Sequence, residues 1–351
     1  MILEKIYKEV ENRITCIDFN KIWPNFKCYK FYIYDESYAY TNGMLISKPE
    51  SFFANTSLEY NNDIVAIWNI NDFDGDFDIL TANLIHEMFH AFQKSNGDNR
   101  YPNDLDLLAY PNDDNIFQLK FNENKILSSI ILNNSFNDLE KFIYIRSLRE
   151  AKLGKIIENE YFAETIEGCA EYAGTMALQQ INKDKYQTRI ERYCSLINTP
   201  TKLLFDVRKI SYYIGTLLQI VLEKRNVNFK IQSEKSIYNI CKEIIRTNKT
   251  NIDINNEVSS FLNIYKESKK EKINIFLQKA NKVVCISSEI CGYDPMNMIR
   301  DNDFILCSHF VFLKENEKII NIMQPVLLHL ENGSNIRIDK YYVLIEEGKV
   351  L

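Results

Sequence analysis

The chain of 351 residues is 46% hydrophobic and 26% charged, so it can bury a large core and form two or three subdomains. Its net charge of −6 speaks against nucleic acid or an anionic membrane surface as a partner, because no basic face dominates. No apolar run approaches transmembrane length and we recognise no signal peptide, so we expect a cytoplasmic protein whose eight cysteines are reduced thiols.

The first third of the chain predicts a helix followed by strands. Residues 1–14 repeat apolar side chains at helical spacing. Residues 28–34, 43–47 and 63–70 are typical of strands, with an Asn-Gly turn signal just ahead of the second one. We interpret residues 1–76 as an N-terminal α/β part, in which the strand at 63–70 is the sheet edge that can pair with an extended peptide.

Acids recur at alternate positions between residues 72 and 78, as they do in a calcium-binding loop. The spaced terminal glutamate of that motif is missing, so we interpret this stretch as a loop and a helix N-cap region. The residues that follow, 78–95, are apolar nearly all round. This composition predicts a buried helix.

The predicted buried helix carries the sequence His86-Glu87-Met88-Phe89-His90. Because an α-helix turns about 100° per residue, His86 and His90 lie on one face and can point both imidazoles at one metal ion. Glu87 lies one step round from His86, where it can reach a water molecule bound to that ion. Buried histidines and acids need partners, and a zinc ion supplies one. We therefore predict one zinc ion per chain.

The middle of the chain begins with a predicted loop at residues 95–124, either a functional lid or a solvated connector. Helical periodicity returns at 137–153 and again at 155–181, where four glutamates line one face. These glutamates are Glu160, Glu164, Glu167 and Glu171. The small residues at 168–170 leave room for another helix to approach closely, which suits a glutamate that reaches a metal on a neighbouring buried helix.

The remainder of the chain divides into helices and then strands. The predicted helices cover residues 184–197, 201–226, 234–247 and 255–281. The predicted strands cover residues 282–288, 304–313, 318–330 and 336–345. We therefore expect a largely helical core at 77–282 and a small antiparallel β module at 283–351.

A catalytic zinc site needs three protein ligands and one open position, so a third ligand must accompany the two histidines. The extended metzincin pattern is excluded, because positions 93 and 96 hold Gln and Asn. The other two histidines, His309 and His329, fall in the β module and are predicted to be ordinary strand residues. We select Glu167 as the third ligand, with Glu123 and Glu164 as alternatives.

At this point the sequence resembles the gluzincin group of zinc metallopeptidases. Their mark is H-E-x-x-H on one helix and a downstream glutamate, often within E-G-x-A-x-Y, on another. His86 to His90 and the sequence EGCAEY at 167–172 match these two motifs. The resemblance implies an α+β, zincin-like fold with an N-terminal mixed sheet and a helical catalytic core. It also implies that Glu167 is the third zinc ligand and that Glu171 orients a ligand histidine.

The resemblance also concerns a tyrosine. In the aminopeptidase-like branch, a Tyr-x-x-Gly that begins a helix supplies the tyrosine that stabilises the tetrahedral intermediate. Tyr212 to Gly215 fits this pattern, with Tyr213 as a rival for Tyr212. Arg208, one turn earlier, either binds a carboxylate or carbonyl of the substrate or forms a surface salt bridge.

These observations predict a zinc-dependent peptidase with Glu87 as general base, acting on a peptide or protein substrate. The G-x-M-x-N strand of the aminopeptidase branch is absent, so endopeptidase and aminopeptidase activity both stay open, as does the oligomeric state. The alternatives are a non-catalytic zincin-like module that binds peptides or proteins, and a toxin-like protease that acts on one target.

Overall fold

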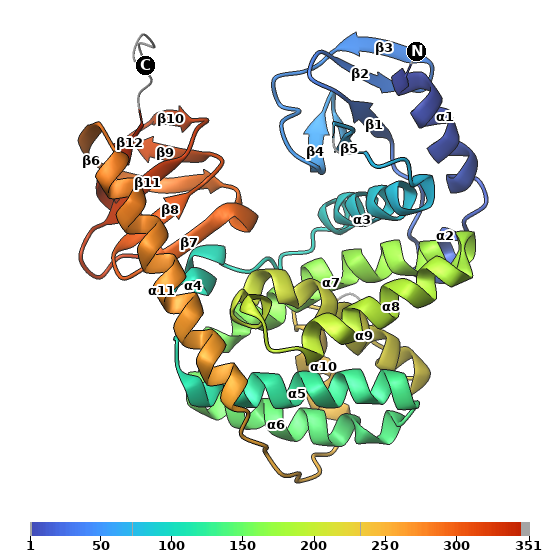
Figure 1. Ribbon diagram of the computed structural model, residues 1–351. Helices are drawn as coiled ribbons and strands as arrows, with labels where there is room; N and C mark the ends of the chain where they lie inside the picture. The colour runs from blue at the N-terminus through green and yellow to red at the C-terminus, as the bar shows by residue number, and fades with distance from the viewer. Residues whose placement is uncertain (1, 72, 232, 345–351) are drawn as a thin grey trace.

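The computed structural model describes residues 2–71, 73–231 and 233–344. Within this range the chain is α+β, as predicted, with one sheet near each end and a helical body between them (Figure 1). No helix among the described residues is both long and apolar enough to cross a membrane. Residue 72 of the acidic stretch and residues 345–351 of the predicted β module lie outside the described residues.

The N-terminal part consists of a five-stranded sheet, within the described residues, and two helices, α1 (Ile2–Ile14) and α2 (Phe19–Ile22). Its strands are β1 (Phe31–Tyr34), β2 (Tyr38–Thr41), β3 (Met44–Ser47), β4 (Thr56–Tyr60) and β5 (Asp63–Asn69), in the order β3-β2-β1-β5-β4. The sheet is mixed, because β1 pairs with β5 in parallel and the other pairs are antiparallel. Asn42 and Gly43, both with positive φ, form the tight turn between β2 and β3.

One prediction about this sheet was wrong. The strand predicted at 63–70 as the sheet edge is β5, which pairs with β1 on one side and with β4 on the other. Its central residues Val65, Ala66 and Ile67 are fully buried, and a continuous apolar run of this kind suits an interior strand. The edge nearest the helical body is β4, where polar and apolar residues are mixed.

The helical body follows the N-terminal sheet. Its helices are α3 (Phe77–Ser95), α4 (Asp104–Leu108), α5 (Asp114–Asn133), α6 (Leu139–Leu153), α7 (Ile156–Ile181), α8 (Lys183–Asn198), α9 (Val207–Lys224), α10 (Ile237–Ile244) and α11 (Asn256–Lys279). The loop predicted at 95–124 was therefore partly wrong, because α4 and the first half of α5 lie within it. The polar residues that indicated a loop include helix N-caps, since Asn103 and Asp113 accept hydrogen bonds from the first N–H groups of α4 and α5.

Helix α7 runs through the middle of the body and is approached closely from two sides (Figure 1). A Cβ atom on Gly174 would lie 2.4 Å from the carbonyl oxygen of Ala82 in α3. A Cβ atom on Gly168 would lie 2.6 Å from the Cα atom of Gly215 in α9. The close helix approach that the small residues at 168–170 predicted is therefore present, and it is made by α9.

The C-terminal part is an antiparallel sheet of seven strands, counted within the described residues. They are β6 (Lys282–Tyr293), β7 (Met298–Asp301), β8 (Phe304–Cys307), β9 (Val311–Glu315), β10 (Lys318–Ile322), β11 (Val326–Leu330) and β12 (Arg337–Val343), in the order β10-β9-β6-β12-β11-β8-β7. The strands predicted at 304–313 and 318–330 are each two strands. In the second case Pro325, which has no N–H group, separates β10 from β11.

The three parts are in contact with one another. Leu105 of α4 belongs to the buried core of the C-terminal sheet, and Asn335 donates a hydrogen bond of 3.0 Å to Asp106. The ring of Phe53, which lies between β3 and β4, contacts the ring of Phe310 with centroids 5.3 Å apart. This contact joins the segment before β4 to the segment before β9, whereas the two sheets themselves lie on opposite sides of the view, above the helical body (Figure 1).

Candidate metal centre

Helix α3 carries the H-E-x-x-H sequence and is fixed firmly at its start. The Asp76 carboxylate accepts hydrogen bonds from two N–H groups of the first turn, so the acidic stretch is an N-cap region, as predicted. Asp76 and Asp78 also form ion pairs of 2.7 and 2.8 Å with Lys185 of α8. The N-cap Asp76 and the first-turn residue Asp78 therefore hold the start of α3 in place.

The metal-binding side chains predicted on α3 and α7 lie together. The Nε2 atoms of His86 and His90 are 3.1 Å apart, and Glu167 Oε2 lies 3.7 Å from the first and 3.2 Å from the second. His86 and Glu167 are buried, with exposed fractions below one tenth, and the side chain of His90 is 12% exposed. Among the described residues this is the one group of His, Cys, Asp and Glu side chains whose ligand atoms converge in this way.

The outer nitrogen of each histidine has a hydrogen-bond acceptor. His86 Nδ1 lies 2.9 Å from Glu171 Oε2, and His90 Nδ1 lies 2.7 Å from Gln93 Oε1. Gln93 is oriented in turn, because its amide nitrogen donates a hydrogen bond of 3.1 Å to the carbonyl oxygen of Ile166. Each Nδ1 therefore carries a proton, and both Nε2 atoms face Glu167, where their lone pairs become available to a metal ion that displaces any proton held there.

Glu167 is held by a second ion pair on its other oxygen. Arg208 Nη2 lies 2.7 Å from Glu167 Oε1, and Arg208 Nε lies 2.9 Å from Asp104 Oδ1 of α4. Of the two sequence-based alternatives, Arg208 forms a salt bridge, but a buried one rather than one at the surface, and its binding to a substrate stays a prediction. Burial raises the pKa of Glu167, but Arg208 and the histidines outweigh this effect and hold that pKa well below its usual range.

Three lone-pair donors thus face one another at short range. Two ligand atoms of a tetrahedral zinc ion, each bonded at about 2.0–2.1 Å, lie about 3.3 Å apart. The observed separations of 3.1, 3.2 and 3.7 Å fit this spacing. Burial lowers the pKa of His86, but Glu167 and Glu171 outweigh it and raise that pKa to about 10, so the cluster attracts positive charge. The donor set therefore fits a divalent metal.

No family model, curated protein or solved structure matches the chain.

Two further side chains predicted to act in catalysis lie beside the cluster. Glu87 is 8% exposed, and its burial raises the pKa of its carboxyl group. The ring of Tyr212 stacks on the ring of His86, with centroids 5.7 Å apart and planes inclined by 7°. The ring of Tyr213 instead contacts that of Tyr193 of α8, with centroids 4.8 Å apart and planes tilted by 50°, so the structure places Tyr212 rather than its rival next to the histidines.

The alternative third ligands, Glu123 and Glu164, lie elsewhere. Both form ion pairs with Arg146 of α6, at 2.9 and 2.5 Å. Along the predicted glutamate stripe of α7, Glu160 and Glu164 contact basic residues of α5 and α6, whereas Glu167 and Glu171 contact histidines of α3. Glu123 and Glu164 were therefore wrong as alternative third ligands, because buried arginines already neutralise their carboxylates.

The remaining histidines lie in the C-terminal part. His309 lies in the loop between β8 and β9, and its Nδ1 atom is 2.9 Å from Asp294. His329 lies on β11, and its Nδ1 atom is 2.6 Å from Asp339. The strand position was therefore confirmed for His329 and wrong for His309. Neither belongs to the convergent group.

Sequence reasoning missed several side chains that support the cluster. Gln93 was used only to exclude the metzincin pattern. Its position three residues after His90 nevertheless places it on the same side of the helix as the histidines. Arg189 and Tyr193 of α8 contact Glu171, the former at 3.4 Å. Asp104 contacts Arg208 from a helix that was predicted to be a loop. No local spacing relates these last three positions to the histidines.

Proposed function

We propose that this protein is a zinc-dependent peptidase with one zinc ion per chain, held by His86, His90 and Glu167. The observation that carries the proposal is the convergence of three lone-pair donors within 3.7 Å, with Glu87 and Tyr212 beside them. When bound, zinc supplies Lewis-acid chemistry, acidifying a water molecule and polarising a carbonyl group. A site with only a structural role gains nothing from an acid placed like Glu87.

The protein's own groups divide the remaining work. The Glu87 carboxylate accepts the proton that water loses as it attacks the scissile carbonyl carbon, and then gives it to the leaving amine nitrogen. The raised pKa of Glu87 strengthens its affinity for that proton during the transfer. Burial and the nearby Glu167 raise the pKa of Tyr212, so its hydroxyl keeps its proton and can donate a hydrogen bond to the developing oxyanion.

The supporting residues keep these groups oriented. Glu171 and Gln93 fix the ring orientation of the two histidines, and Arg208 leaves one oxygen of Glu167 directed toward them. Because each supporting residue is itself held by another contact, the cluster needs little rearrangement during a reaction.

An extended substrate fits the edge strand β4 better than the strand first predicted for this role. β4 is the outer strand on the side of α3, and Lys94 of α3 donates a hydrogen bond to the carbonyl oxygen of Ser57. A peptide that adds to β4 as a further strand runs along the helix that carries the histidines. This placement supports our proposal that the substrate is a peptide chain rather than a small compact molecule.

The test is a comparison of Glu87→Gln with Glu191→Gln, which changes an exposed glutamate of α8. We expect Glu87→Gln to keep its zinc and its fold and to lose hydrolysis of an unfolded casein substrate by about 100-fold or more, because the proton acceptor is removed. Glu191→Gln should match the wild type. Full hydrolysis by Glu87→Gln would refute the peptidase mechanism, and peptide binding without hydrolysis by the wild type would favour a non-catalytic binding module.

A further inference from the structure

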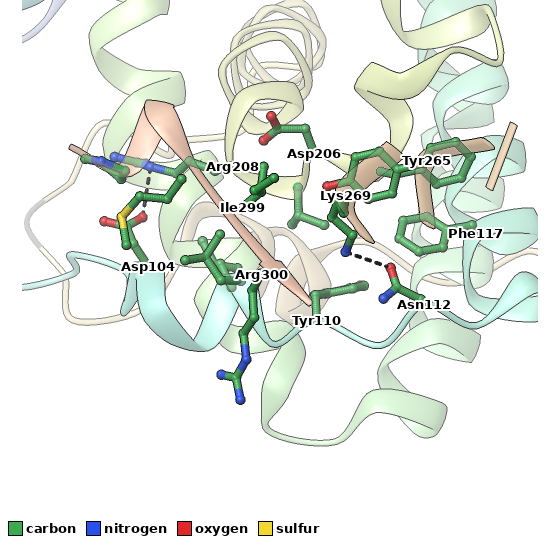
Figure 2. Close-up of a pocket in the computed structure, with 16 residues that line it drawn as sticks. Asp104, Tyr110, Asn112, Phe117, Asp206, Arg208, Tyr265, Lys269, Ile299 and Arg300 are labelled. Atoms are coloured by element: carbon green, nitrogen blue, oxygen red, sulfur yellow. Dashed lines mark hydrogen bonds and ion pairs between the residues drawn. The ribbon is translucent and has the colours of Figure 1, made fainter. Parts of the chain in front are cut away.

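A second pocket lies where the helical body meets the C-terminal sheet. Its walls come from α4, the start of α9, α11 and β7, and its volume is about 40 Å³. Asp104 and Arg208, the pair that supports Glu167, line one end of it, and Lys269 of α11 lies toward the other (Figure 2). The pocket therefore begins beside the candidate metal centre and continues away from it.

Lys269 is a buried cation, and few neighbouring groups offset its positive charge. The residue is 6% exposed, and its Nζ atom donates one long hydrogen bond of 3.5 Å to Asn112 Oδ1. It also lies over the ring of Tyr265, 4.7 Å from the centroid. Within the described residues no carboxylate forms an ion pair with Lys269. Burial accordingly lowers its pKa, with Asp301 acting in the opposite direction through space.

The acids that line the pocket are already paired with other bases. Asp104 lies 2.9 Å from Arg208, and Asp206 lies 3.3 Å from Lys209 while it caps α9. Arg300 of β7 adds positive charge, although its guanidinium turns away from Lys269 and donates to Asn335 at 2.7 Å (Figure 2). The ammonium of Lys269 thus faces the pocket without a negative partner.

We propose that this pocket binds a small oxyanion, a carboxylate or a phosphate group, through Lys269. A buried lysine is stabilised by an opposite charge within hydrogen-bond distance, and charge-assisted bonds of this kind are among the stronger ones. The volume holds a few water molecules, so it accepts one oxyanion group and no larger body. The Asn112 amide group, beside the ammonium, offers a second donor to the same anion.

The first experiment measures thermal stability of the full chain against inorganic phosphate and, separately, against acetate at constant ionic strength. Saturating anion should raise the Tm of the wild type by about 2 °C or more, because a ligand that binds only the folded state stabilises it. Lys269→Met should lose this response, whereas Lys269→Arg, which keeps the charge, and Lys270→Met, on the exposed side of the same helix, should retain it.

The melting temperatures of the same variants without added anion supply an independent readout. Lys269→Met should melt at least as high as the wild type, because it removes an uncompensated buried charge and keeps the apolar length of the side chain. A large loss of stability in Lys269→Met would mean that the lysine is a structural element, and it would overturn the proposal. An anion response in Lys269→Met equal to that of the wild type, or no response of the wild type to either anion, would also overturn it.

Two sources of the anion are distinguished with peptides. If the site receives the end of a peptide chain, Glu87→Gln should bind a fluorescent peptide with a free C-terminal carboxylate at least tenfold more tightly than its C-terminal amide, and Lys269→Met should abolish this difference. Equal binding of the two peptides, together with a phosphate response, would identify a free inorganic anion as the ligand. Because the Tm readout needs no hydrolysis, it stands or fails independently of the proposed peptidase activity.

Discussion

At the scale of single residues, the candidate site combines local and distant information. The pair His86 and His90 followed from helical spacing, and Glu167 followed from its small neighbours and its motif. Asp104, Arg189 and Tyr193 did not follow, because each reaches the cluster through tertiary contacts that no sequence spacing encodes. The ligands were therefore accessible from sequence and most of their supports were not.

The stacking of Tyr212 on His86 leads to a prediction about the oxyanion. Tyr212→Phe removes the hydroxyl and keeps the ring, so zinc content and fold should be unchanged while kcat falls by about 100-fold. Tyr213→Phe, the matched control, should keep the wild-type rate because that ring contacts Tyr193 instead of a histidine. Steady-state kinetics on one peptide substrate decide between them, and equal rates for the two variants would exclude Tyr212 from the reaction.

At the scale of helices and strands, long amphipathic or buried segments were predicted well and short ones were not. The helix at 78–95 and the helix at 155–181 match α3 and α7 within two residues. The strands β2, β4 and β7 were not predicted, because each is only four or five residues long and carries too little alternating pattern, although each pairs with the next strand along the chain. The same limitation explains why β5 was predicted to be the edge.

The contact between α3 and α7 depends on a glycine. Gly174→Ala would place a methyl group 2.4 Å from the carbonyl oxygen of Ala82, so the two helices must separate. We expect a loss of about 1–3 kcal/mol in the free energy of unfolding and weaker metal binding, since His86 and Glu167 lie on these two helices. Gly97→Ala is the control for backbone strain without a steric clash, because Gly97 has a positive φ and open space around the position of its Cβ atom. Equal zinc affinity in Gly174→Ala and the wild type would contradict this account.

The start of α3 should make stability depend on pH. Burial raises the pKa of Asp78, but hydrogen bonds from Lys185, Arg13 and Asn182 outweigh it and lower that pKa to about 2. The folded-state pKa is below the unfolded value of about 3.9, so this stabilisation is complete above about pH 5 and is lost as the pH falls toward 2. Asp78→Asn should cost about 1–2 kcal/mol at pH 7 and progressively less below pH 4, as urea unfolding at several pH values would show. A cost that does not change with pH would refute the ion-pair explanation.

At the scale of the whole molecule, the candidate metal centre lies where the three parts meet. Lys94 links α3 to β4 of the N-terminal sheet, and Arg208 links Glu167 to α4, which enters the core of the C-terminal sheet. The rings of Phe53 and Phe310, just outside the strands, add a contact between the N-terminal and C-terminal parts. Sites between structural units are where ligand-binding clefts concentrate, so this arrangement agrees with a centre that acts on a substrate.

The measurement that tests the central claim most directly is zinc content per chain, determined by elemental mass spectrometry on the wild type, Glu167→Ala and the surface control Glu191→Ala. We expect one zinc ion per chain in the wild type and in Glu191→Ala, and little in Glu167→Ala, because three ligands hold the ion and two histidines alone bind it weakly. Zinc retained fully by Glu167→Ala, or no zinc in the wild type after reconstitution, would contradict the account.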